Sequence, residues 1–290
     1  MTDVSTHTPH YVPRPRTTRG LRSPLGILAL VLVVLILGVA IFCGLIAPYD
    51  PNKQDYNAFL EGPSAAHWLG TDHLGRDLLS RLMYGSRVAL MVGFGAVGFA
   101  MFCGVTLGLL AGYSRGFLDD AIMRVVDAIL AFPSVMLALG IMAALGPGLS
   151  TIIIAIGIAD MPLFARLTRS QVLSVRERDF VTAALAMGAR APRIIIRHIL
   201  PHILGPVIAL ATLQVGHAIL IEAVLSFLGL GVQPPTASWG AILKSGFDYL
   251  ELAPWISAFS GLAILMTVLG VTLLEDALRE QMDPKSGAKT

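Results

Sequence analysis

The sequence predicts an all-α polytopic membrane protein with six transmembrane helices and both termini in the cytoplasm. The first observation behind this prediction is composition, because 55% of the 290 residues are hydrophobic and only 14% are charged. The mean hydropathy is +0.73, whereas a soluble domain carries about 25% charged residues. The other two observations are a series of long apolar runs and an uneven distribution of Lys and Arg between them.

The first predicted span covers residues 25–48 and has no charge between Arg22 and Asp50. It is longer than the roughly 7–15 apolar residues of a signal peptide, and no A-x-A cleavage site follows it. It is long enough to cross a hydrocarbon core of about 30 Å. The remaining predicted spans are residues 88–113, 121–145, 150–165, 203–230 and 256–274. The fourth is short, and we expect Pro162 to break it because proline removes a helix hydrogen bond.

The orientation follows from the distribution of positive charge, since cytoplasmic loops of membrane proteins are enriched in Lys and Arg. With the N-terminus inside, the cytoplasmic segments hold fifteen Lys and Arg and the outer segments hold five. The predicted organisation is a cytoplasmic N-terminal tail over 1–23, a six-span domain over 24–285 and a C-terminal tail over 286–290. Its long cytoplasmic loop covers about 166–201, and its outer loops cover about 49–85 and 231–254.

Small residues in the apolar runs are assigned to packing. Gly104, Gly108 and Gly112 repeat at four-residue spacing, which lets membrane helices approach closely. Their partner is either another helix of this chain or another subunit. Cys43 and Cys103 lie in apolar runs without metal-type spacing, so we expect them to act as small hydrophobic residues.

The loop 166–201 carries seven Arg against two acidic residues. Ser174 and Glu177 have the spacing of a capping box, which predicts a helix over 175–187. Gly188 is suited to the left-handed conformation that ends a helix.

One face of this predicted helix is narrow and apolar. It consists of Phe180, Ala183, Ala184 and Met187, at i, i+3, i+4 and i+7. A face with two alanines buries little area against its own chain. It suits either a groove on a partner protein or the headgroups of the lipid bilayer.

A second short helix follows in the loop, opened by Pro192 at its first turn, and Pro201 predicts a kink before the fifth span. Arg193 and Arg197 share one face of it. We expect them to contact either carboxylates of a partner or lipid headgroups.

The sequence gives no indication of catalysis or of a resident metal. His198 and His202 have the i, i+4 spacing of metal ligands, but two histidines in a polar loop are more often surface residues. No Ser/His/Asp set, carboxylate pair or Cys/His dyad occurs in a shared context. The net charge of +2 does not suggest nucleic acid binding, and none is expected.

Ionisable residues inside the predicted spans are candidates for function because they are energetically costly in a bilayer. Arg124 and Asp127 are spaced to pair on one helix face, with Arg124 snorkelling to the cytoplasmic surface. Asp160 precedes Pro162 and either caps a helix restart or lines a pathway. His217 and Glu222 either face the pathway or form hydrogen bonds between subunits.

The loop motif resembles the "EAA" loop of ABC importer permeases, which has the pattern E-A-A-x3-G-x9-I-x-L-P. The matching residues are Ala183, Ala184, Gly188, Leu200 and Pro201. Two positions depart from the family, which has Glu where this chain has Thr182 and Ile where it has His198. The loss of the Glu puts one contact with the ATPase in doubt.

Other segments resemble the "C" permease of the dipeptide, oligopeptide and nickel import systems. They are residues 67–81, 225–236, 239–240, 278–279 and 283–284. Together with the loop, the resemblance covers roughly residues 46–285. It implies the fold of a type I ABC importer permease in the cytoplasmic membrane.

The resemblance implies that this chain is a permease subunit and not an enzyme. Its implied partners are a second homologous permease, two ABC ATP-binding subunits and an extracytoplasmic substrate-binding protein that docks on the outer loops. The chain has no G-x-x-x-x-G-K-[ST] sequence, so ATP and magnesium are expected in the ATP-binding subunits. The loop 166–201 is then the coupling loop, with Gly188 providing its turn and Leu200-Pro201 joining it to the membrane segment.

The resemblance also implies a mechanism of alternating access with short peptides as cargo. Glutathione, nickel or another small solute is the alternative within the family. A channel that works without an ATPase, or a membrane scaffold, is the alternative from a different class. The sequence does not identify the residues that contact the substrate.

Overall fold

The computed structural model describes residues 21, 23–114 and 116–282, and within them the chain is helical apart from connecting segments and one isolated bridge between Thr71 and Asp77. The predicted tails 1–23 and 286–290 fall almost wholly outside the described residues. The α-helices are α1 (Pro24–Ile46), α2 (Leu78–Ser114), α3 (Phe117–Leu130), α4 (Ser134–Leu145), α5 (Leu149–Arg176), α6 (Asp179–Ala186), α7 (Ala191–Ile194), α8 (Leu200–Phe227), α9 (Trp239–Asp248) and α10 (Pro254–Met282). A 3-10 turn covers Tyr56–Ala58 and a π-helical turn covers Ile195–Ile199.

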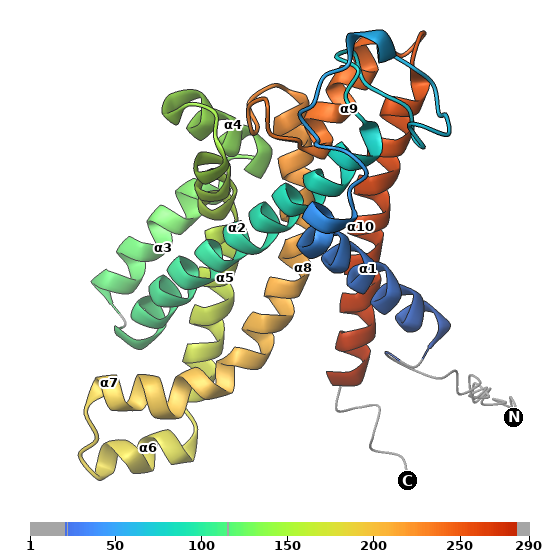
Figure 1. The fold of residues 1–290 in the computed structure, drawn as a ribbon. Helices are drawn as coiled ribbons and strands as arrows, with labels where there is room; N and C mark the ends of the chain where they lie inside the picture. Colours follow the sequence, from blue (N-terminus) through green and yellow to red (C-terminus); the bar gives the residue numbers. More distant parts are fainter. Residues whose placement is uncertain (1–20, 22, 115, 283–290) are drawn as a thin grey trace, which may run out of the picture.

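Among the described residues, five helices are long and apolar enough to cross a membrane: α1, α2, α5, α10 and the continuous stretch Ala191–Phe227 that ends with α8. The third predicted span, residues 121–145, is instead the pair α3 and α4, bent by 91°. The bend falls at Pro133, which has an extended ψ of 132°. Proline restricts the residue before it to extended conformations, so α3 ends and α4 begins in a new direction (Figure 1).

The prediction that Pro162 breaks the fourth span is wrong, because α5 continues through it for 28 residues. Pro162 is buried, and neighbouring helices hold the segment in place on both sides of it. In a membrane, packing of this kind tolerates the lost hydrogen bond.

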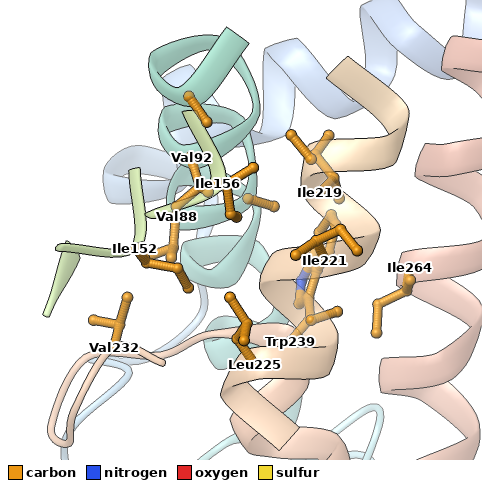
Figure 2. Packing of buried hydrophobic residues seen from close by; sticks show 14 of the residues in the cluster. Val88, Val92, Ile152, Ile156, Ile219, Ile221, Leu225, Val232, Trp239 and Ile264 are labelled. Carbon is orange, nitrogen blue, oxygen red and sulfur yellow. The ribbon is translucent and has the colours of Figure 1, made fainter. Parts of the chain in front are cut away.

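The core lies where α2, α5 and α8 meet, with Val92, Ile156 and Ile219 among its fully or almost fully buried side chains (Figure 2). The predicted glycine face of α2 packs against α5 of the same chain. A Cβ added at Gly104 would lie 2.5 Å from Phe164 Cβ, and one added at Gly112 would lie 2.8 Å from Val172 Cβ. The glycines therefore serve packing within the chain, and the alternative of a contact with another subunit is wrong.

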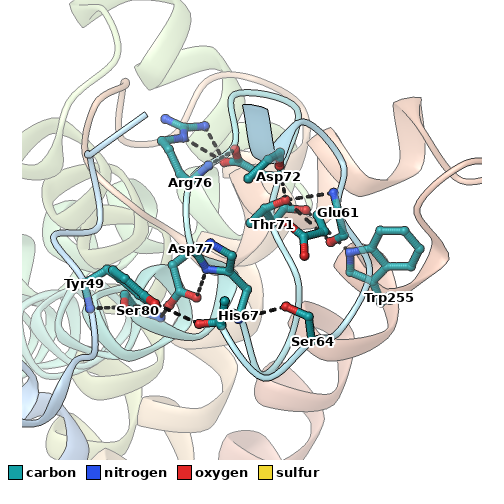
Figure 3. A network of polar contacts seen from close by, with 12 residues as sticks. Tyr49, Glu61, Ser64, His67, Thr71, Asp72, Arg76, Asp77, Ser80 and Trp255 are labelled. Carbon is teal, nitrogen blue, oxygen red and sulfur yellow. Dashed lines mark hydrogen bonds and ion pairs between the residues drawn. The ribbon is translucent and has the colours of Figure 1, made fainter. Parts of the chain in front are cut away.

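The segment before α2 is fixed by a buried polar network (Figure 3). Asp72 pairs with Arg76 at 2.7 Å and with Arg81 at 3.4 Å. Asp77 accepts hydrogen bonds from the Ser80 backbone and hydroxyl at 2.8 and 2.7 Å, which caps the start of α2. This segment and α9 lie at the end of the molecule opposite to α6 and α7 (Figure 1).

Candidate functional sites: a helical loop and an intramembrane cavity

The segment between α5 and α8 has a small hydrophobic core of its own. Val172 and Val175 of α5 cluster with Val181 of α6 and with three buried isoleucines, Ile194, Ile199 and Ile203. Val181 is 1% exposed. The short helices α6 and α7 are therefore packed onto the ends of α5 and α8.

The predicted helix over 175–187 begins later than expected. α5 runs to Arg176, and α6 begins at Asp179 after a break at Glu177 and Arg178. The capping-box prediction is wrong because burial of Val172 and Val175 keeps the residues around Ser174 in the last turns of α5.

The predicted turn at Gly188 is confirmed. Gly188 has a φ of +79°, and the Ala189 N–H donates to the Ala184 carbonyl at 3.1 Å. This bond is typical of a glycine-terminated helix. Pro192 opens α7 as predicted.

The helix that follows α7 does not break at Pro201. A π-helical turn at Ile195–Ile199 runs directly into α8, which makes Ala191–Phe227 one helical stretch of 37 residues. Pro201 lacks the N–H that would bond to the Arg197 carbonyl in an α-helix, and the adjacent π turn takes up this irregularity. Leu200 and Pro201 thus join the loop to α8 without a break.

The free face of α6 differs from the prediction in one residue. Ala183 and Met187 are exposed, with Met187 at 81%, and Phe180 is 36% exposed and stacks on His202 at 4.8 Å. Ala184 is only 2% exposed, so it packs inward beside Val181. Burial of Val181 sets the rotation of α6 and turns Ala184 away from solvent.

The polar residues of the loop are exposed and mostly lack partners within the chain. The hydroxyl of Thr182, which stands where the family has Glu, donates to the Arg178 carbonyl at 3.5 Å, and the side chain is exposed. Arg193 and Arg197 are exposed and have no ion pair in the described part of the chain, and His198 is half-buried. The loop therefore presents an apolar patch beside free guanidinium groups.

Three arginines of α5 fix the loop to the bundle. Arg169 makes a bidentate pair with Asp119 of α3 at 2.6 and 2.7 Å. Arg166 binds Asp127 at 2.6 Å. Arg176 donates to the carbonyls of Gly112 and Tyr113 at the end of α2. Lys or Arg at a helix C-terminus satisfies its last carbonyls.

These contacts correct the predicted pair of Arg124 and Asp127. Asp127 binds Arg166 instead, because the side chain of Arg166 reaches α3 from the neighbouring helix. Arg124 is exposed and forms no ion pair among the described residues.

A second candidate site is a cavity of about 290 Å³ beside the bend between α3 and α4. Asp160 of α5 and Gln214 and His217 of α8 line it. Asp160 Oδ2 lies 3.7 Å from His217 Nδ1. The predicted cap at Asp160 is wrong, since the residue lies in the middle of a continuous α5; the pathway-lining alternative stays a prediction.

Glu222 does not join this cavity. It is 1% exposed, and its carboxylate accepts a hydrogen bond from Ser226 Oγ at 2.7 Å on the same helix. Its partner lies within this chain, so Glu222 contributes to packing around α8.

Two residues of these sites were missed from the sequence. Gln214 lies in an apolar run and is uncharged, so a search for ionisable residues passes over it. Asp119 lies just before the predicted span 121–145, and its hydrogen bond to Arg169 joins residues 50 positions apart. A polar residue one helical turn from His217 was the available signal for Gln214.

Known families and proteins match most of the chain. Residues 104–287 match the model of the binding-protein-dependent transport system inner membrane component. Residues 18–63 match the N-terminal transmembrane domain of oligopeptide transport permease C.

Curated relatives cover the chain almost from end to end. The dipeptide transport system permease protein DppC of Alkalihalophilus pseudofirmus is 45% identical over 91% of this chain and 87% of its own length. The di/tripeptide permease DppC of Pseudomonas aeruginosa is 46% identical over 88% and 86%, respectively. The glutathione permease GsiD of Pectobacterium atrosepticum is 41% identical over 92% and 89%.

A solved structure shares the fold. The inward-facing MetNI methionine ABC transporter matches with a TM-score of 0.57 at 18% identity, covering 69% of this chain and 95% of the MetNI chain.

Proposed function

Because the chain belongs to the family of inner membrane components of binding-protein-dependent transport systems, we propose that it forms the translocation pathway of an ATP-driven importer for short peptides. Two ABC ATP-binding subunits, a second homologous permease and an extracytoplasmic substrate-binding protein complete the importer. Alternating access between the two permeases moves the cargo. ATP and magnesium are bound by the ATP-binding subunits, and both termini of this chain face the cytoplasm.

The observation that carries the proposal is the loop from α6 to α7, with its exposed Ala183 and Met187 beside two unpaired arginines. An amphipathic helix that presents few apolar side chains fits a shallow groove on a partner. Because the loop shares a core with α5 and α8, a movement of the ATP-binding subunit is passed to both membrane helices. Arg193 and Arg197 pair with carboxylates at the rim of that groove.

The opposite end of the molecule provides the surface for the substrate-binding protein. Trp255 donates to the Thr71 carbonyl at 3.4 Å, and His73 contacts Ser245 at 2.7 Å. These contacts fasten the segment before α2 to α9 and α10, so this end offers a rigid surface. Trp68 is 69% exposed there, and exposed aromatic residues are common at the centre of protein interfaces.

Short peptides are the proposed cargo because relatives at 45% and 46% identity are named as dipeptide and di/tripeptide permeases. Glutathione, itself a short peptide, is the second candidate and is favoured by the relative at 41% identity. The whole complex, purified with its binding protein and placed in proteoliposomes, should accumulate L-alanyl-L-alanine only when ATP is supplied. The degree to which unlabelled glutathione inhibits this uptake then shows which of the two cargoes is preferred.

A pair of variants at one position tests the role of the loop. Ala183→Asp places a charge on the free face of α6 and should abolish ATP-dependent uptake while the protein remains in the membrane. Ala183→Ser keeps the size and should transport at the wild-type rate. Normal uptake by the Asp variant would exclude a coupling role and favour contact with lipid headgroups.

A further inference from the structure

The cavity beside the bend between α3 and α4 contains buried polar atoms that form no hydrogen bond within the described chain. Asp160 Oδ2, Gln214 Nε2 and His217 Nδ1 are each buried without a hydrogen-bond partner among the described residues. Asp160 is 2% exposed and Gln214 is 9% exposed. A buried polar group without a partner is destabilising, and a buried carboxylate more so. Asp160 Oδ2 and His217 Nδ1 face each other at 3.7 Å, which is too long for a hydrogen bond, and Gln214 Nε2 has no partner among the described residues. A further polar group entering the cavity would complete their hydrogen bonds.

Measured from the N-terminal end of α5, the cavity lies about half a hydrocarbon core deep. Asp160 is eleven residues into α5, or about 16 Å along it at the helical rise of 1.5 Å per residue. That is about half of a hydrocarbon core of ~30 Å. An ionisable group at this depth marks a substrate pathway or a polar contact by default, and transporters place substrate sites near the midplane.

The cavity opens to the outside of the chain on the side of His217, whose side chain is 40% exposed. An imidazole and a carboxylate facing hydrocarbon would be unfavourable. That face therefore meets either a water-filled pathway or another protein.

The lining selects for positive charge. Asp160 is its one carboxylate, and no Lys or Arg is among the described residues that line it. Gln214 and His217 add groups able to hydrogen-bond. Phe132 and Leu163 complete the wall with apolar surface, which offers no hydrogen-bonding group to the side chains of a ligand.

We propose that this cavity is a contact site on the translocation pathway that binds the α-ammonium group of the transported peptide. The carboxylate of Asp160 forms an ion pair with this ammonium group, and Gln214 donates a hydrogen bond from Nε2 to the first peptide carbonyl. His217 borders the entrance of the cavity. Every short peptide with a free amino terminus offers this ammonium and carbonyl, so the site recognises the class without selecting side chains. The inference rests on the proposed function in peptide transport.

The test uses the complete complex with its binding protein in proteoliposomes and L-alanyl-L-alanine as the probe. Asp160→Asn keeps the shape and removes the charge, and Asp160→Glu retains the charge. Glu222→Gln is the matched control, because it removes an intramembrane carboxylate that is bound to Ser226 outside the cavity. We expect uptake by the Asn variant to fall about tenfold, as for loss of one charge-assisted hydrogen bond. The Glu variant should recover most of the loss, and the control should transport as wild type.

Three outcomes would overturn the inference, and they are distinguishable. If Asp160→Asn takes up peptide as fast as an active wild type, the cavity is not a contact site for the cargo, and the proposed function is unaffected. Loss of the second permease or of the ATP-binding subunits from purified Asp160→Asn complex assigns the cavity to a contact between subunits. Absence of peptide uptake by the wild type refutes the proposed function, and the inference with it.

Discussion

Close packing of α2 on α5 predicts a large difference between two glycines of the same helix. A Cβ at Gly108 would lie 2.5 Å from Thr168 Cβ and 2.6 Å from the Ala165 carbonyl oxygen. Both atoms belong to or adjoin the backbone of α5, so no side-chain rotation relieves the clash. A Cβ at Gly98, also in α2, meets nothing within 4 Å.

The substitutions Gly108→Ala and Gly98→Ala gain the same helix propensity, roughly 0.8–1.0 kcal/mol. Overpacking a core costs about 1–3 kcal/mol, and only Gly108→Ala incurs it. We therefore expect Gly108→Ala to have a free energy of unfolding about 1–3 kcal/mol below that of Gly98→Ala.

Equilibrium unfolding by SDS in mixed micelles, followed by tryptophan fluorescence, measures this difference. The wild type provides the reference, and Gly98→Ala should be as stable as the wild type or more so. If Gly108→Ala unfolded together with Gly98→Ala, the two helices would not be in backbone contact and the assignment of the glycine face to α5 would be wrong.

Two further predictions concern the network before α2. Asp72→Ala leaves the buried guanidinium of Arg76 unpaired and should lower the free energy of unfolding by about 3–5 kcal/mol in the same assay. The control Glu251→Ala, at an exposed site, should change the free energy of unfolding by less than about 0.5 kcal/mol. Equal effects of the two substitutions would contradict the pairing of Asp72 with Arg76. Burial lowers the pKa of His73 below its ordinary value of 6.5, so below pH 6.5 the unfolded chain takes up a proton before the folded chain does. Stability should therefore fall as the pH decreases through 6.5 toward the lowered pKa, and His73→Gln should reduce that fall; an unchanged pH profile would refute it.

Hydropathy predicted the spans well because it measures the property that places a helix in a bilayer. It did not distinguish two prolines with opposite effects. Pro133 separates α3 from α4, whereas Pro162 lies inside α5. The difference comes from tertiary packing, since the residues next to Pro162 contact Gly104 of α2 and α5 continues without a break.

For the loop, the sequence predicted the turn at Gly188 but not the rotation of α6 about its own axis. Gly188 is recognisable from sequence because few residues adopt a positive φ. The inward position of Ala184 depends on Val181, which enters a core built from three separate elements. Similarly, Asp160 was a candidate from its charge alone, but its neighbours across the cavity come from α8, more than 50 positions away in sequence. Such long-range contacts leave no local pattern.

The most direct test of the account is the composition of the complex that this chain forms. A tagged chain, extracted gently from its native membrane and analysed by mass spectrometry, should carry two ABC ATP-binding subunits and a second permease of the same family. Ala183→Asp should reduce the amount of ATP-binding subunit recovered, whereas Ala183→Ser should not. Recovery of the chain alone or as a homo-oligomer, without any ATP-binding subunit, would contradict the account and favour a channel or a scaffold.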